Sequence, residues 1–291
     1  MAMDKSARKT PAKSIVCADS DALLLDAIGE LFRNKGYDVH LARDGLEALR
    51  VIRKVRPSCI VLDIVLPKID GSRVCWLIRQ DRNLRDTPVI ALSSLGPHDI
   101  RRFPELSADA YVAKGPLAVV ANNLLLAVRY LEKSGPGHLD GGIFGYEGFR
   151  PRKLISEMLL LKRHWDTLMR TLDRGMVQLD PDGEILMANA RASKILGRKE
   201  ARLIGERLPS LFPSPDQRVI QELLDERRTA PRPGEDHVVV SLGDQEVSLR
   251  FFPVVEEGTC TAMLVTLEPK RLEAIGSKLA ARSQAKESPE G

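Results

Sequence analysis

The sequence between Ser14 and Glu132 alternates five short apolar segments with amphipathic helical patterns. Each apolar segment has the length of a buried strand and is bounded by charged or turn-forming residues. Two of the helical patterns, at residues 23–35 and 45–54, are followed by the helix-ending residues Gly36 and Pro57. Five strand–helix units in succession predict an α/β fold with a parallel sheet. The predicted strands are Ser14–Ala18, Asp38–Ala42, Cys59–Leu62, Val89–Leu92 and Ala110–Val112.

Polar side chains follow four of these predicted strands. Asp19 comes after the first strand, Asp63 after the third, Ser93 after the fourth and Lys114 after the fifth. Right-handed crossovers in a parallel sheet place the functional crevice beyond the carboxyl ends of the strands, where the strand order reverses. We therefore expect two carboxylates, a hydroxyl and an ammonium group to meet in one crevice.

These groups are suited to the transfer of a phosphoryl group. A carboxylate can attack phosphorus, but two neighbouring carboxylates repel each other unless a hard divalent cation such as Mg²⁺ shields them. Asp19, Asp63 and the backbone carbonyl of Val65 are candidate oxygen ligands for Mg²⁺. The Lys114 ammonium can pair with one phosphoryl oxygen, and the Ser93 hydroxyl can donate a hydrogen bond to another.

Residues 14 to about 132 resemble a response-regulator receiver over their whole length. The matching segments are Ile15–Asp19, Val61–Pro67, Asp70–Gly71, Ala91–Ser94 and Ala110–Lys114. The resemblance implies a flavodoxin-like, five-stranded receiver domain at residues 14–133, with Asp63 as the phosphoacceptor for a histidine kinase or phosphotransfer protein. It also implies that Asp19 is a metal ligand, Ser93 the switch hydroxyl, Tyr111 the switch aromatic and Lys114 the lysine typical of the family.

Two positions depart from the pattern of that family. Receivers usually carry adjacent acids after the first strand, whereas this chain has Ser20 in the second position and Asp21 after it. Ser20 or Asp21 is either a further metal ligand, or Asp21 begins the next helix, where a carboxylate favours the N-terminal dipole. The usual Lys-Pro is also replaced by Lys114-Gly115-Pro116. An unphosphorylated pseudo-receiver therefore stays an alternative.

A heptad pattern follows a Gly/Pro-rich linker at residues 134–152. The helix predicted at residues 153–173 has leucine at each d position, while its a positions are Met158, Trp165 and Leu172. Glu157 occupies a g position and Lys162 the following e position, so a parallel partner helix would meet opposite charges. We expect a homodimer through Leu154–Leu172, and the alternative is an amphipathic helix packed on its own domain.

Residues 174–269 carry the pattern of a second, α+β domain. Two strand patterns joined at Asp182-Gly183 predict a hairpin, and three more follow at residues 237–242, 247–254 and 260–267. Short helical segments lie between these two groups of strands. The pattern predicts an antiparallel sheet with helices on one face. It resembles a PAS domain in the segments Leu179–Ile185, Asn189, Ala192 and Leu203–Gly205.

A ligand for this domain is not identified by the sequence. The resemblance implies a pocket for haem, flavin or a metabolite, because such ligands bind between sheet and helices. Residues 190–236 contain no cysteine for a photoactive flavin and no histidine for haem, and His237 begins a strand as a surface residue. The sequence argues against these two cofactors and favours an apo or metabolite-binding interaction domain.

Composition narrows the class of protein. The net charge is only +4 and the basic residues are dispersed, which argues against a nucleic-acid partner. No segment approaches the roughly 18 consecutive apolar residues of a membrane span, and residues 1–13, expected to be flexible, lack a secretory signal. We expect a cytoplasmic protein.

Four cysteines without metal-ligand spacing are expected to be reduced core residues, namely Cys17, Cys59, Cys75 and Cys260.

These patterns favour a phosphorylation-gated signalling adaptor over an enzyme. The tail at residues 270–291 is expected to start as a helix and end disordered, and no kinase, cyclase or DNA-binding pattern is recognised. A downstream protein partner is then expected to respond to the state of Asp63 through the heptad helix and the PAS domain. The alternatives are a constitutive scaffold and a truncated kinase-related subunit, the latter disfavoured because His164 and His237 are misplaced for a phosphorylatable histidine.

Overall fold

A computed structural model describes residues 13–102, 107–135, 142–147, 153–232 and 234–270. The chain divides into two compact units, Met1–Asp166 and Thr167–Gly291. Most of the expected flexible N-terminus and nearly all of the expected tail, at residues 1–12 and 271–291, lie outside the described residues.

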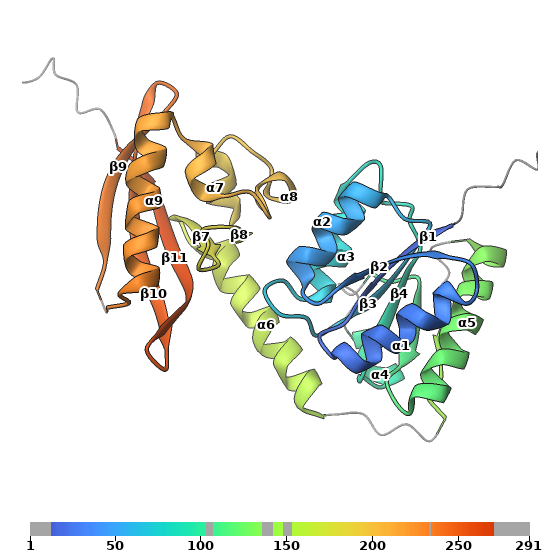
Figure 1. The fold of residues 1–291 in the computed structure, drawn as a ribbon. Helices are drawn as coiled ribbons and strands as arrows, with labels where there is room; N and C mark the ends of the chain where they lie inside the picture. Colours follow the sequence, from blue (N-terminus) through green and yellow to red (C-terminus); the bar gives the residue numbers. More distant parts are fainter. Residues whose placement is uncertain (1–12, 103–106, 136–141, 148–152, 233, 271–291) are drawn as a thin grey trace, which may run out of the picture. The chain divides into compact units, whose positions relative to one another are not determined.

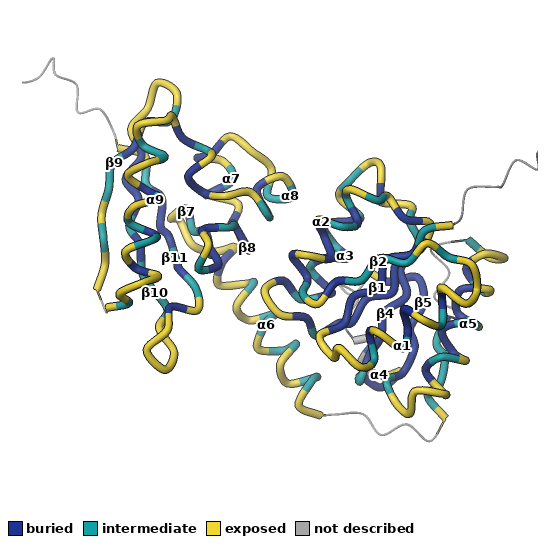
Figure 2. The backbone as a smooth tube through the Cα atoms, in the orientation of Figure 1, coloured by how far each residue is buried: buried dark blue, intermediate teal, exposed yellow. Residues whose placement is uncertain are grey.

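The first unit is built on a parallel sheet with the strand order β2-β1-β3-β4-β5-β6. Its central strands are fully buried, because helices cover both faces. Figure 2 shows these strands as the buried centre of the unit. The predicted parallel α/β sheet is confirmed, with six strands in place of five. The strands are β1 Ser14–Ala18, β2 Asp38–Ala42, β3 Cys59–Asp63, β4 Val89–Ser93, β5 Ala110–Ala113 and β6 Ile143–Phe144.

Helices cover both faces of this sheet (Figure 1). Helices α1 (Ala22–Arg33) and α5 (Leu117–Ser134) pack their apolar sides on one face, where Phe32 and Leu124 are fully buried. Helix α2 (Gly45–Val55) packs against β1 and β2 and contacts α3 (Gly71–Gln80). A short helix, α4 (Pro97–Arg102), follows β4.

Aspartate side chains cap the first three helices at the crevice end of the sheet. Asp21 accepts hydrogen bonds from the backbone of α1, Asp44 from that of α2 and Asp70 from that of α3. Each carboxylate satisfies backbone N–H groups that the first turn leaves without intrahelical partners. The helices therefore begin immediately after the loops that carry the polar residues.

Strand β6 is an addition that the sequence analysis did not foresee. Part of the segment expected to be a Gly/Pro-rich linker pairs with β5 in parallel, Ile143 opposite Tyr111 and Phe144 opposite Val112. The Tyr111 backbone N–H donates to the Gly142 carbonyl at 2.6 Å. The ring of Phe144 also packs edge-on against Tyr130 of α5, with ring centroids 5.9 Å apart.

The second unit contains an antiparallel sheet with the strand order β8-β7-β11-β10-β9. Register places Leu249 opposite Leu267 and Phe251 opposite Val265, so that the inner face is continuous and apolar. Residues with positive φ form the two tight turns, Gly243 between β9 and β10 and Glu257-Gly258 between β10 and β11. The strands are β7 Gly175–Leu179, β8 Ile185–Ala188, β9 Asp236–Leu242, β10 Gln245–Glu256 and β11 Thr259–Pro269.

Four helical segments connect β8 to β9. They are α7 Ala190–Ile195, α8 Glu200–Leu203, the 3₁₀ segment η3 Leu208–Leu211 and α9 Ser214–Thr229. Helices α7 and α9 contact the sheet. Helix α9 is longer than the short helical segments expected from the sequence, because Ile220 and Leu224 supply an apolar face that is buried.

The predicted heptad helix is observed as α6 (Lys153–Thr171), which crosses the boundary between the units. All six predicted seam residues are exposed in the single chain, and Leu161 keeps 69% of its surface and Leu168 58%. The helix ends earlier than predicted, so that the last seam residue, Leu172, lies one residue beyond it. Among the described residues, no helix combines the length and the apolar character needed to cross a membrane.

Candidate functional site

Four strand ends bring the predicted polar residues into one crevice of the first unit. Asp19 follows β1, Asp63 is the last residue of β3, Ser93 is the last residue of β4 and Lys114 follows β5. Parallel pairing of β3 with β4 and of β4 with β5 sets their order along the edge of the sheet. Asp19, Asp63 and Ser93 are all buried, with 0%, 4% and 1% of their surface exposed.

Lys114 joins the two carboxylates. Its Nζ atom lies 2.8 Å from Oδ2 of Asp19 and 2.8 Å from Oδ2 of Asp63. Both acids are buried, so their charges are poorly solvated, and the ammonium group compensates both at once. The two carboxylates raise the pKa of Lys114 and outweigh the effect of its burial.

The Asp63 carboxyl lies in an environment that disfavours its charged form. Burial raises its pKa to about 6, the neighbouring Asp19 adds to the increase, and Lys114 and the Val65 backbone oppose it. The Val65 N–H donates to Oδ1 of Asp63 at 3.1 Å, which leaves Oδ2 directed at Lys114. One ammonium group shared between two carboxylates thus leaves the negative charge of Asp63 only partly compensated.

The oxygen donors of the crevice fit a hard cation. They include one carboxylate fewer than in receivers that carry two adjacent acids after the first strand. Asp19 and Asp63 offer carboxylate oxygens, and the Val65 carbonyl belongs to the same loop. Ser20 is exposed, and Asp21 uses Oδ1 to accept from the N–H groups of Leu23 and Leu24 at 3.0 and 3.2 Å. Of the two interpretations of Asp21, the structure shows the helix cap. Within the described residues, no group of three or more acidic, histidine or cysteine side chains is placed to hold a metal.

Gly71 allows the loop after Asp63 to fold back on the strand. A Cβ atom at Gly71 would lie 1.9 Å from the Asp63 backbone carbonyl oxygen, a distance that no side chain tolerates. The Gly71 N–H also donates to the Ile64 carbonyl at 3.0 Å. The absence of a side chain at this position therefore helps to hold Asp63 in the crevice.

Ser93 links the loops after β4 and β5. Its hydroxyl accepts a hydrogen bond from the Leu95 N–H at 2.9 Å, and its carbonyl accepts from the Lys114 N–H at 2.9 Å. Tyr111, the predicted switch aromatic, is buried on β5. Burial raises the pKa of Tyr111, and a hydrogen bond with the Ala108 backbone acts in the opposite direction.

Tyr146 also reaches this crevice, and the sequence analysis missed it. It lies two residues after β6, and its hydroxyl is buried. Burial raises the pKa of Tyr146, and the nearby Ser93 side chain opposes this increase. The only signal in the sequence was an aromatic residue among glycines, which does not reveal a contact with a strand 53 residues earlier.

Helix α6 contacts the loop region that follows Asp63. The Lys162 ammonium donates to Oδ1 of Asp70 at 2.9 Å and to the Ser72 hydroxyl at 2.8 Å. Asp70 is the N-terminal cap of α3 and also accepts from the Arg73 N–H at 2.9 Å. Lys162 is therefore anchored within its own unit in the single chain.

In the second unit, Asn189 fastens the end of α6 to the sheet. Its amide group donates to the carbonyls of Met169 and Arg174 at 3.2 and 2.9 Å. Its Oδ1 atom accepts from the N–H groups of Met176 and Ala192 at 3.0 and 2.8 Å. All the hydrogen-bonding capacity of this buried amide is thus used by four backbone groups.

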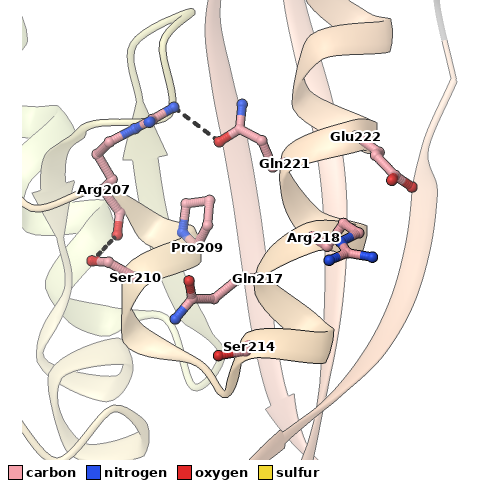
Figure 3. A pocket seen from close by; sticks show the side chains of 8 residues that line it. All are labelled: Arg207, Pro209, Ser210, Ser214, Gln217, Arg218, Gln221 and Glu222. Carbon is pink, nitrogen blue, oxygen red and sulfur yellow. Dashed lines mark hydrogen bonds between the residues drawn. The ribbon is translucent and has the colours of Figure 1, made fainter.

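A hollow on the second unit lies outside the space between sheet and helices. It has a volume of about 390 Å³ and is formed by η3, α9 and the residue before η3 (Figure 3). Arg207 at its edge donates to the Gln221 side chain at 2.9 Å. The lining residues are Arg207, Pro209, Ser210, Ser214, Gln217, Arg218, Gln221 and Glu222. Nothing in this open hollow identifies a ligand.

Comparison with family models gives one match in each unit. Residues 15–124 match the response regulator receiver domain, and residues 163–247 match the PAS fold. The order of the two matches is the order expected from the sequence.

Two curated relatives are similar to the first unit. The polar-differentiation response regulator DivK of Brucella anthropi is 33% identical over 108 residues, which are 37% of this chain and 87% of DivK. The DNA-binding dual master transcriptional regulator RpaA of Synechocystis is 35% identical over 102 residues, which are 34% of this chain. The chain spans only 42% of the length of RpaA.

Solved structures are similar to each of the two units. The receiver domain of the Francisella response regulator 1452 has 30% identity and a TM-score of 0.37, with 42% of this chain and 97% of that chain covered. The PAS domain of Bordetella pertussis BvgS has 17% identity and a TM-score of 0.35, with 43% of this chain and 98% of that chain covered.

Proposed function

The chain belongs to the response-regulator receiver family, and on that premise we propose that Asp63 accepts a phosphoryl group from a histidine kinase or phosphotransfer protein. The observation that supports this proposal is the joint contact of Lys114 with Asp19 and Asp63 at 2.8 Å in a buried crevice. Phosphoryl donors of this kind are charged from ATP, so we propose that the reaction takes place in the cytoplasm.

In the proposed reaction, an oxygen of Asp63 attacks the phosphorus atom of a phosphohistidine. The new O–P bond makes a mixed anhydride, while the P–N bond breaks and its electron pair returns to the donor imidazole. Lys114 is already 2.8 Å from the attacking carboxylate and would pair with a phosphoryl oxygen. Ser93 would donate its hydroxyl proton to another phosphoryl oxygen.

Asp19, Asp63 and the Val65 carbonyl would hold Mg²⁺, with water completing its octahedral shell. The cation would offset the negative charge of the carboxylates and of the incoming phosphate. Because Asp21 is engaged as a helix cap, Ser20 is the position where this chain lacks an acid. We therefore propose that Mg²⁺ binds more weakly here than in receivers with two adjacent acids.

The proposed output is a change in protein contacts relayed by α6. Lys162 contacts Asp70 at the start of α3, seven residues after the phosphoacceptor, and Asn189 fastens the other end of the helix to the PAS domain. Such a relay requires an element with two conformations. Phosphorylation at one end and partner binding at the other must both change the populations of these conformations. A downstream protein would then recognise the PAS domain or the helix.

A parallel homodimer through α6 is part of this proposal. The six seam residues form an exposed apolar stripe, with leucine at every d position. A second copy of the chain presents an identical heptad pattern, so its helix would pack along this stripe in register. Glu157 at g and Lys162 at e would offer opposite charges across the seam, although Lys162 must first leave Asp70. The residues are Leu154, Met158, Leu161, Trp165, Leu168 and Leu172.

A constitutive scaffold is the second candidate, favoured by the missing acid at Ser20. In that case, the receiver and the PAS domain would provide docking surfaces regardless of phosphorylation. One experiment separates the two candidates. The protein is incubated with an acyl phosphate with and without Mg²⁺, and label and oligomeric state are recorded together by mass spectrometry and light scattering. Mg²⁺-dependent labelling supports the phosphoacceptor, and an unlabelled protein beside a labelled control receiver supports the scaffold.

A further inference from the structure

The antiparallel sheet of the second unit has one covered edge and one open edge. At β8, the Ile185 N–H donates to the Glu206 carbonyl at 2.9 Å, and the Ile185 carbonyl accepts from the Gly205 N–H at 2.8 Å. A bridge between Glu184 and Arg207 extends this cover. Strand β9 forms the opposite edge, and no further strand pairs with it in the part of the chain that the structure describes. An open edge presents backbone groups to which another strand can bind.

The hairpin between β9 and β10 determines which β9 backbone groups face outward. Its turn has two residues, so Leu242 and Gln245 form the closing hydrogen-bonded pair. Backbone groups of an antiparallel strand alternate in direction, so every second residue before Leu242 faces β10 and the others face away from it. The Ser241 N–H follows this rule, because it donates to Oδ2 of Asp216 on α9 at 2.7 Å. The outward groups, which we call the β9 edge, are those of His237, Val239 and Ser241.

Helix α9 contacts β9 and is fastened to it at both ends (Figure 1). Asp216, in the first turn of the helix, accepts from Ser241 near the end of the strand. Arg227, in the last turn, pairs with Asp236 at the start of the strand. Helix and strand therefore run antiparallel. Val219 lies on the same face of the helix as Asp216 and keeps 46% of its surface exposed, so an apolar side chain stands beside the β9 edge.

The charges near the β9 edge are predominantly acidic. Three acids are each paired with an arginine, namely Asp236 with Arg227, Glu226 with Arg232 and Glu235 with Arg250. Two further acids on α9, Asp216 and Glu222, have no ion pair within the described ranges of the chain. A second copy of β9 would bring the same two acids to this edge again, whereas a basic segment would compensate them. The charge of the surface therefore favours a basic partner over self-association.

We propose that the β9 edge binds an extended, basic segment of a partner protein as a further strand of the five-stranded sheet. The backbone groups of His237 and Val239 would provide the hydrogen bonds, and an apolar side chain of the segment would pack beside Val219. Basic side chains next to it would face the two unpaired acids. This inference goes beyond the proposed function, because it assigns the partner a surface that is available whether or not Asp63 is phosphorylated.

The test uses the full chain and a capped synthetic peptide in which valine and lysine alternate. Isothermal titration measures binding, and amide hydrogen exchange is followed by NMR at Val239. We expect saturable binding that slows exchange at Val239 by about tenfold, while exchange at Val240, whose N–H faces β10, stays unchanged. The same peptide with glutamate in place of lysine should bind about tenfold more weakly, because its charges repel the unpaired acids.

Two substitutions at Val239 separate backbone pairing from side-chain contacts. Proline is tolerated on an edge strand where the N–H faces solvent, so Val239→Pro should keep the fold while peptide binding falls about tenfold. Val239→Ala retains the N–H and is the matched control, with binding close to that of the wild type. Val219→Glu, at an exposed position of α9, leaves the strand intact and should weaken binding through loss of the apolar contact.

The outcomes distinguish this inference from the proposed function. Reduced binding in Val239→Pro with binding retained in Val239→Ala supports the β9 edge. Equal binding in these variants, or no binding of the lysine peptide in the millimolar range, would overturn it. Exchange at Val239 that slows with protein concentration in the absence of peptide would identify a second copy as the occupant and would also overturn it. Failure to label Asp63 would remove the phosphoacceptor and leave this result unaffected.

Discussion

The Nζ atom of Lys114 lies 2.8 Å from Oδ2 of Asp63 in a crevice where the aspartate is almost completely buried. A second contact of the same length joins Lys114 to Asp19. One ammonium group thus compensates two carboxylates that would otherwise repel each other. The electrostatic balance of the crevice therefore depends on this lysine.

Replacing Lys114 with methionine should destabilise the first unit when Mg²⁺ is absent. Removal of one partner from a buried ion pair leaves the other charge uncompensated, which typically costs about 3–5 kcal/mol. Added Mg²⁺ should restore much of the lost free energy of unfolding, because the cation binds the two carboxylates of the folded protein in preference to the unfolded chain. Chemical denaturation at several Mg²⁺ concentrations measures both effects.

Lys13→Met is the matched control for this variant. Lys13 also pairs with an acid at 2.7 Å, but its side chain is 62% exposed and that of Glu132 43%. Solvent screens such a pair, so the loss should stay below about 1 kcal/mol and should not respond to Mg²⁺. Equal losses in the two variants would contradict the importance of burial at Lys114.

The pKa of Asp63 predicts a specific dependence of stability on pH. Burial raises this pKa from 3.8 to about 6, so the folded protein binds more protons than the unfolded chain between these values. Stability contributed by the protonated carboxyl is therefore present below about pH 4 and is lost as pH rises to about 6. Asp63→Asn should remove this decrease and raise stability at pH 7 by on the order of 2 kcal/mol.

Thermal unfolding in a chelating buffer across pH 4–7 tests this prediction, since bound Mg²⁺ would stabilise the charged form. Asp70→Asn is a useful comparison, because Asp70 lies in the same loop region but its side chain is partly exposed. A pH profile of Asp63→Asn that parallels the wild type would show that Asp63 is not the group responsible.

Asp21 and Ser20 should have separable effects on stability and on metal binding. Because Asp21 caps α1, Asp21→Ala should lower the free energy of unfolding by about 1 kcal/mol while Mg²⁺ affinity stays unchanged. Ser20→Asp should strengthen Mg²⁺ binding roughly tenfold by adding a carboxylate at the crevice. Isothermal titration measures the affinities. A loss of Mg²⁺ affinity in Asp21→Ala would make Asp21 a ligand instead of a cap.

The exposed stripe on α6 predicts a dimer that can be disrupted without unfolding either unit. The double change Leu161→Glu and Leu168→Glu should convert the dimer to a monomer, since it places four charges in the seam of the pair. Stability of the monomer should change little, because both leucines are more than half exposed. Arg170→Glu, at an outer heptad position, should remain dimeric. A wild type that light scattering shows to be monomeric at tens of micromolar would contradict the dimer.

The strand ends were predictable because each follows from a local pattern. The segments predicted from Ser14 and Asp38 have the observed bounds, and the one ending at Leu62 extends by a single residue to Asp63. Short apolar segments between charged residues have few alternatives in an α/β sheet, and the crossover rule then brings Asp19, Asp63, Ser93 and Lys114 together. The hairpin at Gly183 was predictable for a similar reason, since its φ of +82° needs glycine.

The parts that escaped prediction depend on contacts distant in sequence. Strand β6 has only two residues, too few for a periodic pattern, and it forms because the edge of β5 offers unpaired backbone groups. The position of Tyr146 near Ser93 follows from that pairing. The helix cap of Asp21 was one of two open interpretations, because an acid after a strand suits a metal ligand and a cap equally well.

The most direct test of the central claim is to locate the phosphoryl group after incubation with an acyl phosphate and Mg²⁺. Wild type and Asp63→Asn are compared by intact mass, and the modified peptide is sequenced by mass spectrometry. The account predicts one phosphoryl group per chain in the wild type, on the peptide that contains Asp63, and none in Asp63→Asn. Equal labelling of both proteins, or a wild type that stays unmodified while a control receiver is labelled, would contradict it.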